Sequence, residues 1–85
     1  MNGMARMEIA VYPLGTGDTS ISREVAHILP VLDRCGLVYE TTVVGTVVEG
    51  TPGQLFTLAR DMHESVASRT GRVITTIRID DRRDA

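Results

Sequence analysis

The sequence predicts one α+β domain in which two helices cover one face of a four-stranded antiparallel sheet. Its 85 residues are 42% hydrophobic, which is enough for a packed core without metals or disulfides. Four short segments are rich in β-branched residues or alternate in polarity, as strands do. Two longer segments carry apolar residues at helical spacing. In chain order these segments predict strand, helix, strand, strand, helix and strand.

The first strand is predicted over residues 6–12. Its odd-numbered residues, from Met7 to Val11, are apolar and point to one face, and its even-numbered residues point to the other. Pro13 is expected to end the strand because it lacks a backbone N–H. Residues 14–20 are rich in Gly, Thr, Asp and Ser, so a loop is expected there.

The first helix is predicted over residues 21–35. Ser20 or Ser22 can cap its start, and Gly36 is suited to end it. Pro30 lies inside this segment, where it removes one helical hydrogen bond, so a kink or a break is expected. The predicted apolar stripe consists of Ile21, Val25, Ile28, Leu29, Leu32 and Cys35.

The remaining strands are predicted from β-branched, alternating segments. Residues 37–44 are expected to form the second strand and residues 46–49 the third, with Gly45 as the turn between them. Residues 72–79 are expected to form the last strand. The middle two strands therefore make a hairpin.

The second helix has the clearest start in the chain. Thr51 is expected at the N-cap and Pro52 at the first helical position, while Gln54 completes a capping box. Gly71 is expected to close the helix. Its apolar stripe consists of Leu55, Leu58, Ala59, Met62, Val66 and Ala67.

This order of elements is the ferredoxin-like βαββαβ arrangement. The whole of residues 1–85 is expected to be a single domain, with residues 1–5 and 81–85 as loose tails. The sheet face turned away from the helices would carry Ala10, Tyr12 and Ile74. A partly apolar open face normally meets a partner. Self-association is therefore expected.

The composition excludes several kinds of site. Cys35 is the only cysteine, so the chain can form no internal disulfide and no multi-cysteine metal site. His27 and His63 are far apart in sequence, and each is more typical of a packed or surface histidine than of a ligand. No metal is expected. The absence of lysine excludes a Schiff base and a P-loop.

The chain also predicts a cytoplasmic protein without membrane or nucleic-acid partners. It has no apolar run of membrane-spanning length and no signal-peptide core at its start. A net charge of −2 gives no electrostatic reason to bind nucleic acid. No catalytic motif of the hydrolase, metalloprotease or dinucleotide-binding classes occurs. The expected function is binding rather than catalysis, with no cofactor required.

Two segments are the best candidates for a small-molecule site. The first runs from Tyr12 through Thr16 to Ser20 and Ser22 at the helix start. The second is residues 45–50, in which a carboxylate ends a short apolar strand between glycines. Period two places Thr46 and Glu49 on opposite faces of that strand. Glu49 taken alone is equally well explained as an exposed carboxylate at a strand end.

At these segments the sequence resembles the thiamine-binding protein family. The resemblance covers nearly the whole chain, and the order and spacing of the motifs make it specific. The motifs are Pro13-Leu14-Gly15-Thr16, Ser20 to Ser22, Gly36-Leu37-Val38-Tyr39, Gly45-Thr46-Val47-Val48-Glu49-Gly50, His63-Glu64 and Ile79-Asp80-Asp81-Arg82. Pro30 and Val44 depart from the family pattern, and neither change removes a polar group that could bind ligand.

The resemblance implies binding of thiamine or its hydroxymethylpyrimidine portion, and assembly into a homotetramer built as a dimer of dimers. Thiamine is a cation with a flat aminopyrimidine ring, so its site needs a carboxylate, hydroxyls and an apolar wall. Glu49 is the first choice for the carboxylate. The hydroxyls would come from Thr46, Ser22, Thr16 and Ser20, and the stacking ring from Tyr39 or Tyr12.

The alternative is a structural or protein-interaction module that uses the open sheet face only for oligomerisation. That alternative accounts for the apolar face but leaves the segment at residues 45–50 unexplained. Acylphosphatases share the topology but need an arginine in the loop after the first strand, and residues 14–19 contain none. RNA-recognition domains need exposed aromatics over a basic surface, which this chain lacks beyond Tyr12.

Overall fold

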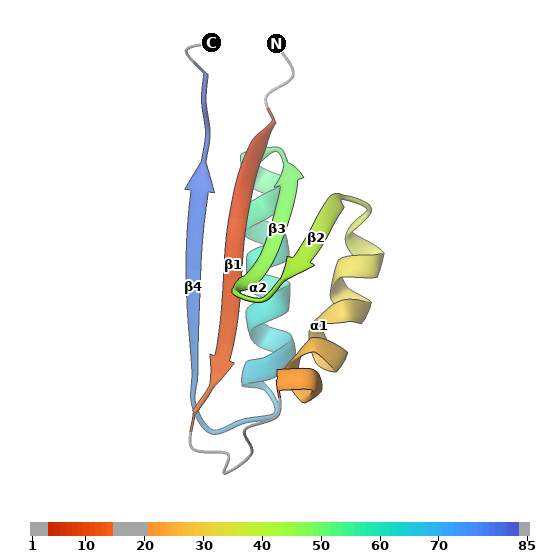
Figure 1. Ribbon diagram of the computed structural model, residues 1–85, viewed down its shortest axis with the longest axis vertical. Coiled ribbons are helices and arrows are strands. Elements are labelled where there is room, and N and C mark those ends of the chain that lie inside the picture. The colour runs from red at the N-terminus through yellow and green to blue at the C-terminus, as the bar shows by residue number, and fades with distance from the viewer. Residues whose placement is uncertain (1–3, 15–20, 84–85) are drawn as a thin grey trace.

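The fold has the predicted βαββαβ order, with two helices on one face of a four-stranded sheet (Figure 1). The computed structural model describes residues 4–14 and 21–83, and within the first helix it describes side chains from Ala26 onward. The sheet order is β2-β3-β1-β4, and every neighbouring pair is antiparallel. The elements are β1 Ala5–Pro13, α1 Ile21–Cys35, β2 Val38–Thr42, β3 Gly45–Gly50, α2 Pro52–Ala67 and β4 Val73–Asp80.

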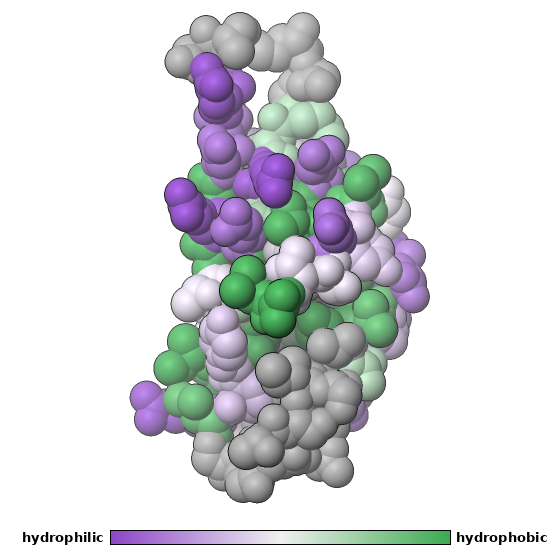
Figure 2. All heavy atoms as spheres, in the orientation of Figure 1, coloured by the Kyte–Doolittle hydropathy of each residue, from purple (hydrophilic) through white to green (hydrophobic). Residues whose placement is uncertain are grey.

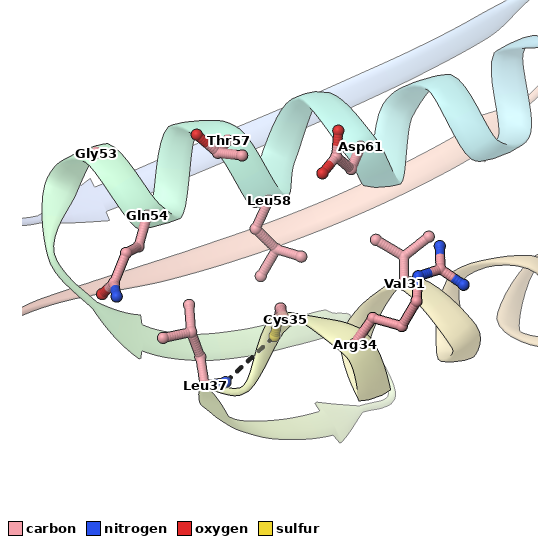
Figure 3. A pocket seen from close by; sticks show the side chains of 9 residues that line it. All are labelled: Val31, Arg34, Cys35, Leu37, Gly53, Gln54, Thr57, Leu58 and Asp61. Atoms are coloured by element: carbon pink, nitrogen blue, oxygen red, sulfur yellow. Dashed lines mark hydrogen bonds between the residues drawn. The ribbon is translucent and has the colours of Figure 1, made fainter.

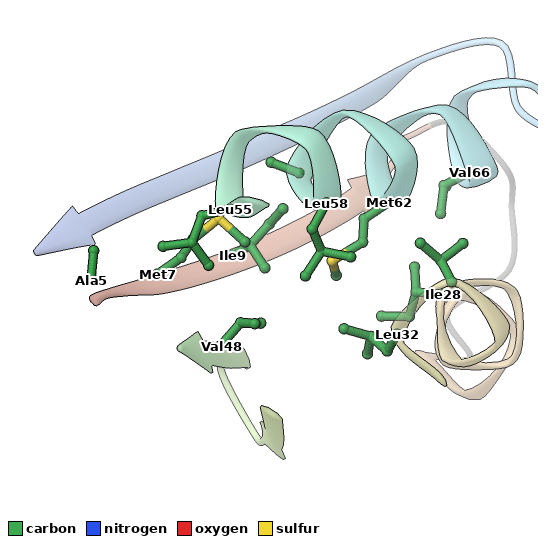
Figure 4. Packing of buried hydrophobic residues seen from close by; sticks show 12 residues of the cluster. Ala5, Met7, Ile9, Ile28, Leu32, Val48, Leu55, Leu58, Met62 and Val66 are labelled. Atoms are coloured by element: carbon green, nitrogen blue, oxygen red, sulfur yellow. The ribbon is translucent and has the colours of Figure 1, made fainter. Parts of the chain in front are cut away.

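The core lies between the sheet and the two helices (Figure 4). Met7 and Ile9 of β1 point into it beside Val48 of β3, as the alternation predicted. The predicted stripe of α2 supplies the opposite wall, with Leu55, Leu58, Ala59, Met62 and Val66 buried. Burial of a large aliphatic side chain contributes about 1.5–3 kcal/mol, so these residues dominate the stability of the domain.

The first helix continues through its proline. Pro30 is exposed, and α1 runs from Ile21 to Cys35 without the expected break at this residue. Leu32 is buried, as predicted, and Val31 is also buried although it lay outside the predicted stripe. The contacts of Ile28, Val31 and Leu32 with the core compensate for the one helical hydrogen bond that proline removes.

The second helix begins as predicted but ends earlier. Gln54 N donates to Thr51 Oγ1 at 3.2 Å and Thr51 N donates to Gln54 Oε1 at 2.9 Å, which completes the capping box. The helix closes at Ala67, four residues before Gly71. Ser68 is its C-cap residue, and Ser68 N donates to Glu64 O at 3.0 Å. The backbone therefore ends the helix without a glycine.

The prediction that Gly45 forms the hairpin turn was wrong. The turn is made by Val43 and Val44, and both are exposed. Thr42 holds the turn, since its Oγ1 donates to Gly45 O at 3.0 Å and accepts from Val44 N at 3.3 Å. Gly45 is the first residue of β3 and has a φ of 149°. A Cβ there would lie 2.6 Å from Ile9 O, so β1 passes too close for any side chain.

The ends of the strand β1 also differ from expectation. Ala5 is buried and paired with Gly50, so it belongs to the sheet rather than to a loose tail. Pro13 is the last residue of β1, opposite Val73 of β4.

At the other end of the chain, residues 81–83 are exposed and follow β4 without regular structure. Across the described residues, no helix is long and apolar enough to cross a membrane.

Candidate functional site

The candidate site lies on the open face, which is the sheet face turned away from the helices. Strand register and burial define its residues as Arg6, Glu8, Ala10 and Tyr12 of β1, Val38, Glu40 and Thr42 of β2, Gly45, Val47 and Glu49 of β3, and Ile74, Thr76, Arg78 and Asp80 of β4. Figure 2 shows this face, with hydrophilic residues over the end where β4 finishes and apolar residues over the β2–β3 turn. The open face is therefore divided into a charged end and an apolar end.

A groove of about 470 Å³ crosses the open face at the boundary between these two ends. That volume lies within the usual range for small-molecule sites. Open-face residues that line it are Glu8, Ala10, Tyr12, Thr42, Gly45, Val47, Thr76 and Arg78, together with Val44 of the turn. Ile9 and Thr46 also line it, but their side chains are buried on the helix side, so they contribute backbone atoms.

Glu8 is the carboxylate of this groove. It lies directly across from Val47 on one neighbouring strand and from Arg78 on the other. Within residues 4–14 and 21–83 its carboxylate has no hydrogen bond or ion pair. An exposed, unpaired carboxylate in a groove that two threonines also line can accept a cation without first breaking an internal bond.

Tyr12 forms one wall of the groove and is 49% exposed. It lies opposite Ile74 on β4, and Ala10 precedes it by two residues on the same face. An accessible phenol ring beside small and aliphatic side chains is suited to stacking against a flat ring or facing a cation. The groove thus offers a ring, a carboxylate and hydroxyls in one place.

The structure separates the predicted site residues. Tyr12 lines the groove, and Glu49 is on the same face one row away, opposite Arg6 and Val38. Thr46 is buried on the helix side, as period two requires. Thr16 and Ser20 lie outside the described residues. Ser22 belongs to α1, but its side chain also lies outside the described part of the chain.

Tyr39 faces the helices instead of the open face. It pairs with the buried Val48 on β3, and its hydroxyl donates to Asp33 Oδ1 of α1 at 2.7 Å. This hydrogen bond, followed by desolvation and the Asp33 charge, raises the pKa of the Tyr39 phenol above its ordinary value. Tyr39 and Tyr12 therefore cannot line one site within a single chain.

Comparison with known proteins gives the family. A family model described as thiamine-binding protein matches residues 7–85. The chain belongs to the thiamine-binding protein family. A UPF0045 protein of Methanothermobacter thermautotrophicus is 39% identical over 84 residues, which cover 96% of this chain and 85% of that protein. The predicted resemblance is thereby confirmed.

Solved structures agree with the membership in the thiamine-binding family. The crystal structure of a hypothetical protein from Methanocaldococcus jannaschii has a TM-score of 0.88 and 30% identity, covering 98% of this chain and 84% of its own. A Thermotoga maritima protein, named provisionally for thiamine biosynthesis or salvage, has a TM-score of 0.80 and covers 93% of this chain and 84% of its own. Its 18% identity shows a shared fold alone.

Sequence reasoning missed Glu8, Arg78, Thr42 and Thr76 as groove residues of this family member. Alternation already placed Glu8 on the same face as Tyr12, so that signal was present. The order and register of the strands were needed to place the other three in the same groove, because they come from β2 and β4. Among the described residues, no cluster of three or more His, Cys, Asp or Glu side chains could hold a metal ion.

Proposed function

We propose that this protein binds thiamine or its hydroxymethylpyrimidine portion in the open-face groove and does not transform it. The family match over residues 7–85 carries the proposal. The family is named for binding rather than for a reaction, which supports a non-catalytic role. The single cysteine is typical of the cytoplasm, where we place the protein.

The chemistry of the groove suits such a ligand. Thiamine carries a permanent positive charge, which Glu8 would face directly and Glu49 from one row away. The hydroxyls of Thr42 and Thr76 can donate to and accept from an aminopyrimidine edge, and Tyr12 can stack on its ring. One charged hydrogen bond contributes about 1.5–3 kcal/mol, equivalent to roughly one to two decades of affinity.

The same groove disfavours phosphorylated forms. Arg78 is the only arginine among its lining residues, and Glu8 lies directly opposite it in the sheet. A diphosphate requires several convergent donors, such as bidentate arginines. We therefore propose unphosphorylated thiamine or hydroxymethylpyrimidine as the preferred ligand.

A second candidate function is self-association through the open face, as a homotetramer or a smaller assembly. The exposed Tyr12, Val44 and Ile74 at its apolar end favour this candidate, because neighbouring exposed apolar side chains mark interaction surfaces. Light scattering on a sizing column gives the mass of the assembly. A monomeric mass at all concentrations would eliminate this candidate and leave the binding proposal in place.

Calorimetric titration tests the binding proposal. Protein shown to carry no co-purified ligand is titrated with thiamine, hydroxymethylpyrimidine and thiamine diphosphate. Saturable binding of the first two, at micromolar or lower dissociation constants, with weaker binding of the diphosphate, is the expected result. No heat and no shift in melting temperature with any of the three would overturn the proposal and leave the interaction module as the better account.

A further inference from the structure

A second groove lies on the other side of the molecule, between the two helices. Its volume is about 370 Å³, within the usual range for small-molecule sites. The residues that line it are Val31, Arg34 and Cys35 of α1, Leu37 after that helix, and Gly53, Gln54, Thr57, Leu58 and Asp61 of α2. Figure 3 shows the two helices as its opposite walls. The sheet separates this groove from the open face.

The middle of the helix groove is apolar. Leu58 points into it from α2, and Val31 and Leu37 face it from the opposite side (Figure 3). Cys35 is half-buried beside them, with Leu37 N donating to its Sγ at 3.4 Å. The floor is thus made of side chains already fixed by the core, and it needs no rearrangement to receive an apolar group.

The two charged side chains that line the groove differ in their bonding. Arg34 has no hydrogen bond or ion pair anywhere in the described part of the chain. Asp61, on the opposite helix, already forms an ion pair, because Arg60 Nε and Nη2 each donate to its Oδ1 at 3.2 Å. Asp61 therefore already holds an ion-pair partner, and Arg34 is the charged side chain of the groove that is open to pair with a ligand.

The other polar groups of the groove are also donors. Gln54 Oε1 already accepts from Thr51 N in the capping box, which leaves the amide NH₂ of Gln54 to face a ligand. The Thr57 hydroxyl lies on the same wall, between Gln54 and Asp61 along α2. Donors at Arg34 and at Gln54 thus stand at the two ends of an apolar floor.

We propose that the helix groove is a second ligand site, separate from the open face, that takes a small organic anion with an apolar body. The carboxylate or phosphate of the ligand pairs with Arg34, and its body lies against Leu37 and Leu58. A guanidinium presents paired N–H donors in a plane, which match both kinds of oxyanion. Thiamine, as a cation, is not a ligand of this groove.

The test uses the full-length chain labelled with ¹⁵N and titrated, by amide NMR, with four probes of similar shape. Benzoate and phenyl phosphate carry the anion, benzamide is neutral and benzylamine is a cation. Saturable shifts at Gly53, Thr57 and Leu37 are expected with the two anions and not with the other two. The ratio of the two anion affinities tells whether the site prefers a carboxylate or a phosphate.

Matched variants give the decisive comparison. Arg34→Gln weakens anion binding about tenfold, as loss of one charged hydrogen bond predicts, and Arg69→Gln, outside the groove, leaves it unchanged. Asp61→Asn tightens anion binding, because it removes the negative charge that lines the groove. Equal affinity of Arg34→Gln and the parent chain, equal binding of benzylamine, or shifts confined to Ala10 and Val47 of the open face would each overturn the proposal.

Discussion

The hydroxyl of Tyr39 and the carboxylate of Asp33 join an edge strand to a helix. Tyr39 lies on β2, which pairs with only one other strand, and Asp33 lies near the end of α1. Their 2.7 Å hydrogen bond holds β2 against the helix layer. The other contact of β2 is its pairing with β3 along one edge. The bond also raises the pKa of Tyr39, since a phenol that donates to a carboxylate resists losing its proton.

We predict that Tyr39→Phe lowers the urea midpoint of unfolding, because β2 loses its hydrogen bond to α1. The raised folded-state pKa means that the stabilisation is complete below the ordinary phenol pKa of 10.0 and is lost as pH rises through the folded value. The difference between the parent chain and the variant should therefore be constant near neutral pH and shrink above pH 10. Urea unfolding followed by circular dichroism at several pH values measures it.

Tyr12→Phe is the matched control for that experiment. The Tyr12 hydroxyl makes no hydrogen bond to any described residue, so its removal should leave the midpoint nearly unchanged. Equal midpoints for Tyr39→Phe and the parent chain would show that β2 is held by strand pairing alone.

We predict that Gly45→Ala destabilises the domain by about 1–3 kcal/mol, the usual cost of forcing a strained backbone conformation on a residue with a side chain. Its φ of 149° disfavours any L side chain, and the new Cβ would lie 2.6 Å from Ile9 O. Since β1 is the central partner of β3, the strain falls on the middle of the sheet. Thermal and urea unfolding measure the change.

Gly71→Ala provides the control for this substitution. Its φ is not positive, and no atom lies within 4 Å of the Cβ that alanine would add. Alanine there should leave stability unchanged or raise it by about 0.4–1 kcal/mol, by restricting the unfolded chain. A stability for Gly45→Ala as high as that of Gly71→Ala would mean that β1 and β3 can separate locally at little cost.

We predict that Thr51→Ala lowers the free energy of unfolding by about 1 kcal/mol, the typical cost of losing an N-cap side chain. The substitution leaves Gln54 N without its side-chain acceptor and breaks one half of the capping box. Ser68→Ala, at the C-cap of the same helix, should have little effect because the bonds there come from the backbone. An equal loss at both ends would contradict a specific role for the Thr51 hydroxyl.

The sequence predicted the fold because each element carries a strong local signal. The capping box at Thr51 and the alternation around Met7 and Ile9 depend on residues within one element, and the structure confirms them. The hairpin turn was misplaced because Val43 and Val44 are β-branched and look like strand. Gly45 instead lies in β3 against β1, a contact between segments about 35 residues apart that local pattern cannot reveal.

The groove was only partly predictable for a related reason. Alternation shows that Glu8 and Tyr12 share a face, but not that Arg78 lies across from Glu8 and Thr42 across from Gly45. Those neighbours depend on strand order and register, and a shift of one residue would turn them to the other face. That Tyr39 faces the helices was not predictable either, because its hydrogen bond to Asp33 depends on where α1 packs.

We predict that Glu8→Gln weakens thiamine binding about tenfold or more, since a charged hydrogen bond contributes about 1.5–3 kcal/mol. Glu49→Gln should weaken it several-fold and less than Glu8→Gln, because Glu49 acts on the cation from the next row of the open face. Both carboxylates are exposed and unpaired within the described residues, so neither change should move the melting temperature appreciably. Calorimetric titration of each variant measures the dissociation constants.

Glu64→Gln on α2 is the charge-matched control, because it removes the same charge outside the open-face groove. Equal affinities for Glu8→Gln, Glu64→Gln and the parent chain would place the thiamine site elsewhere. A larger effect at Glu49 than at Glu8 would instead move the cation toward the charged end of the face, next to Arg6 and Asp80. In that arrangement Tyr12 would lie too far along β1 to stack on the ligand, so Tyr12→Ala would leave the affinity unchanged.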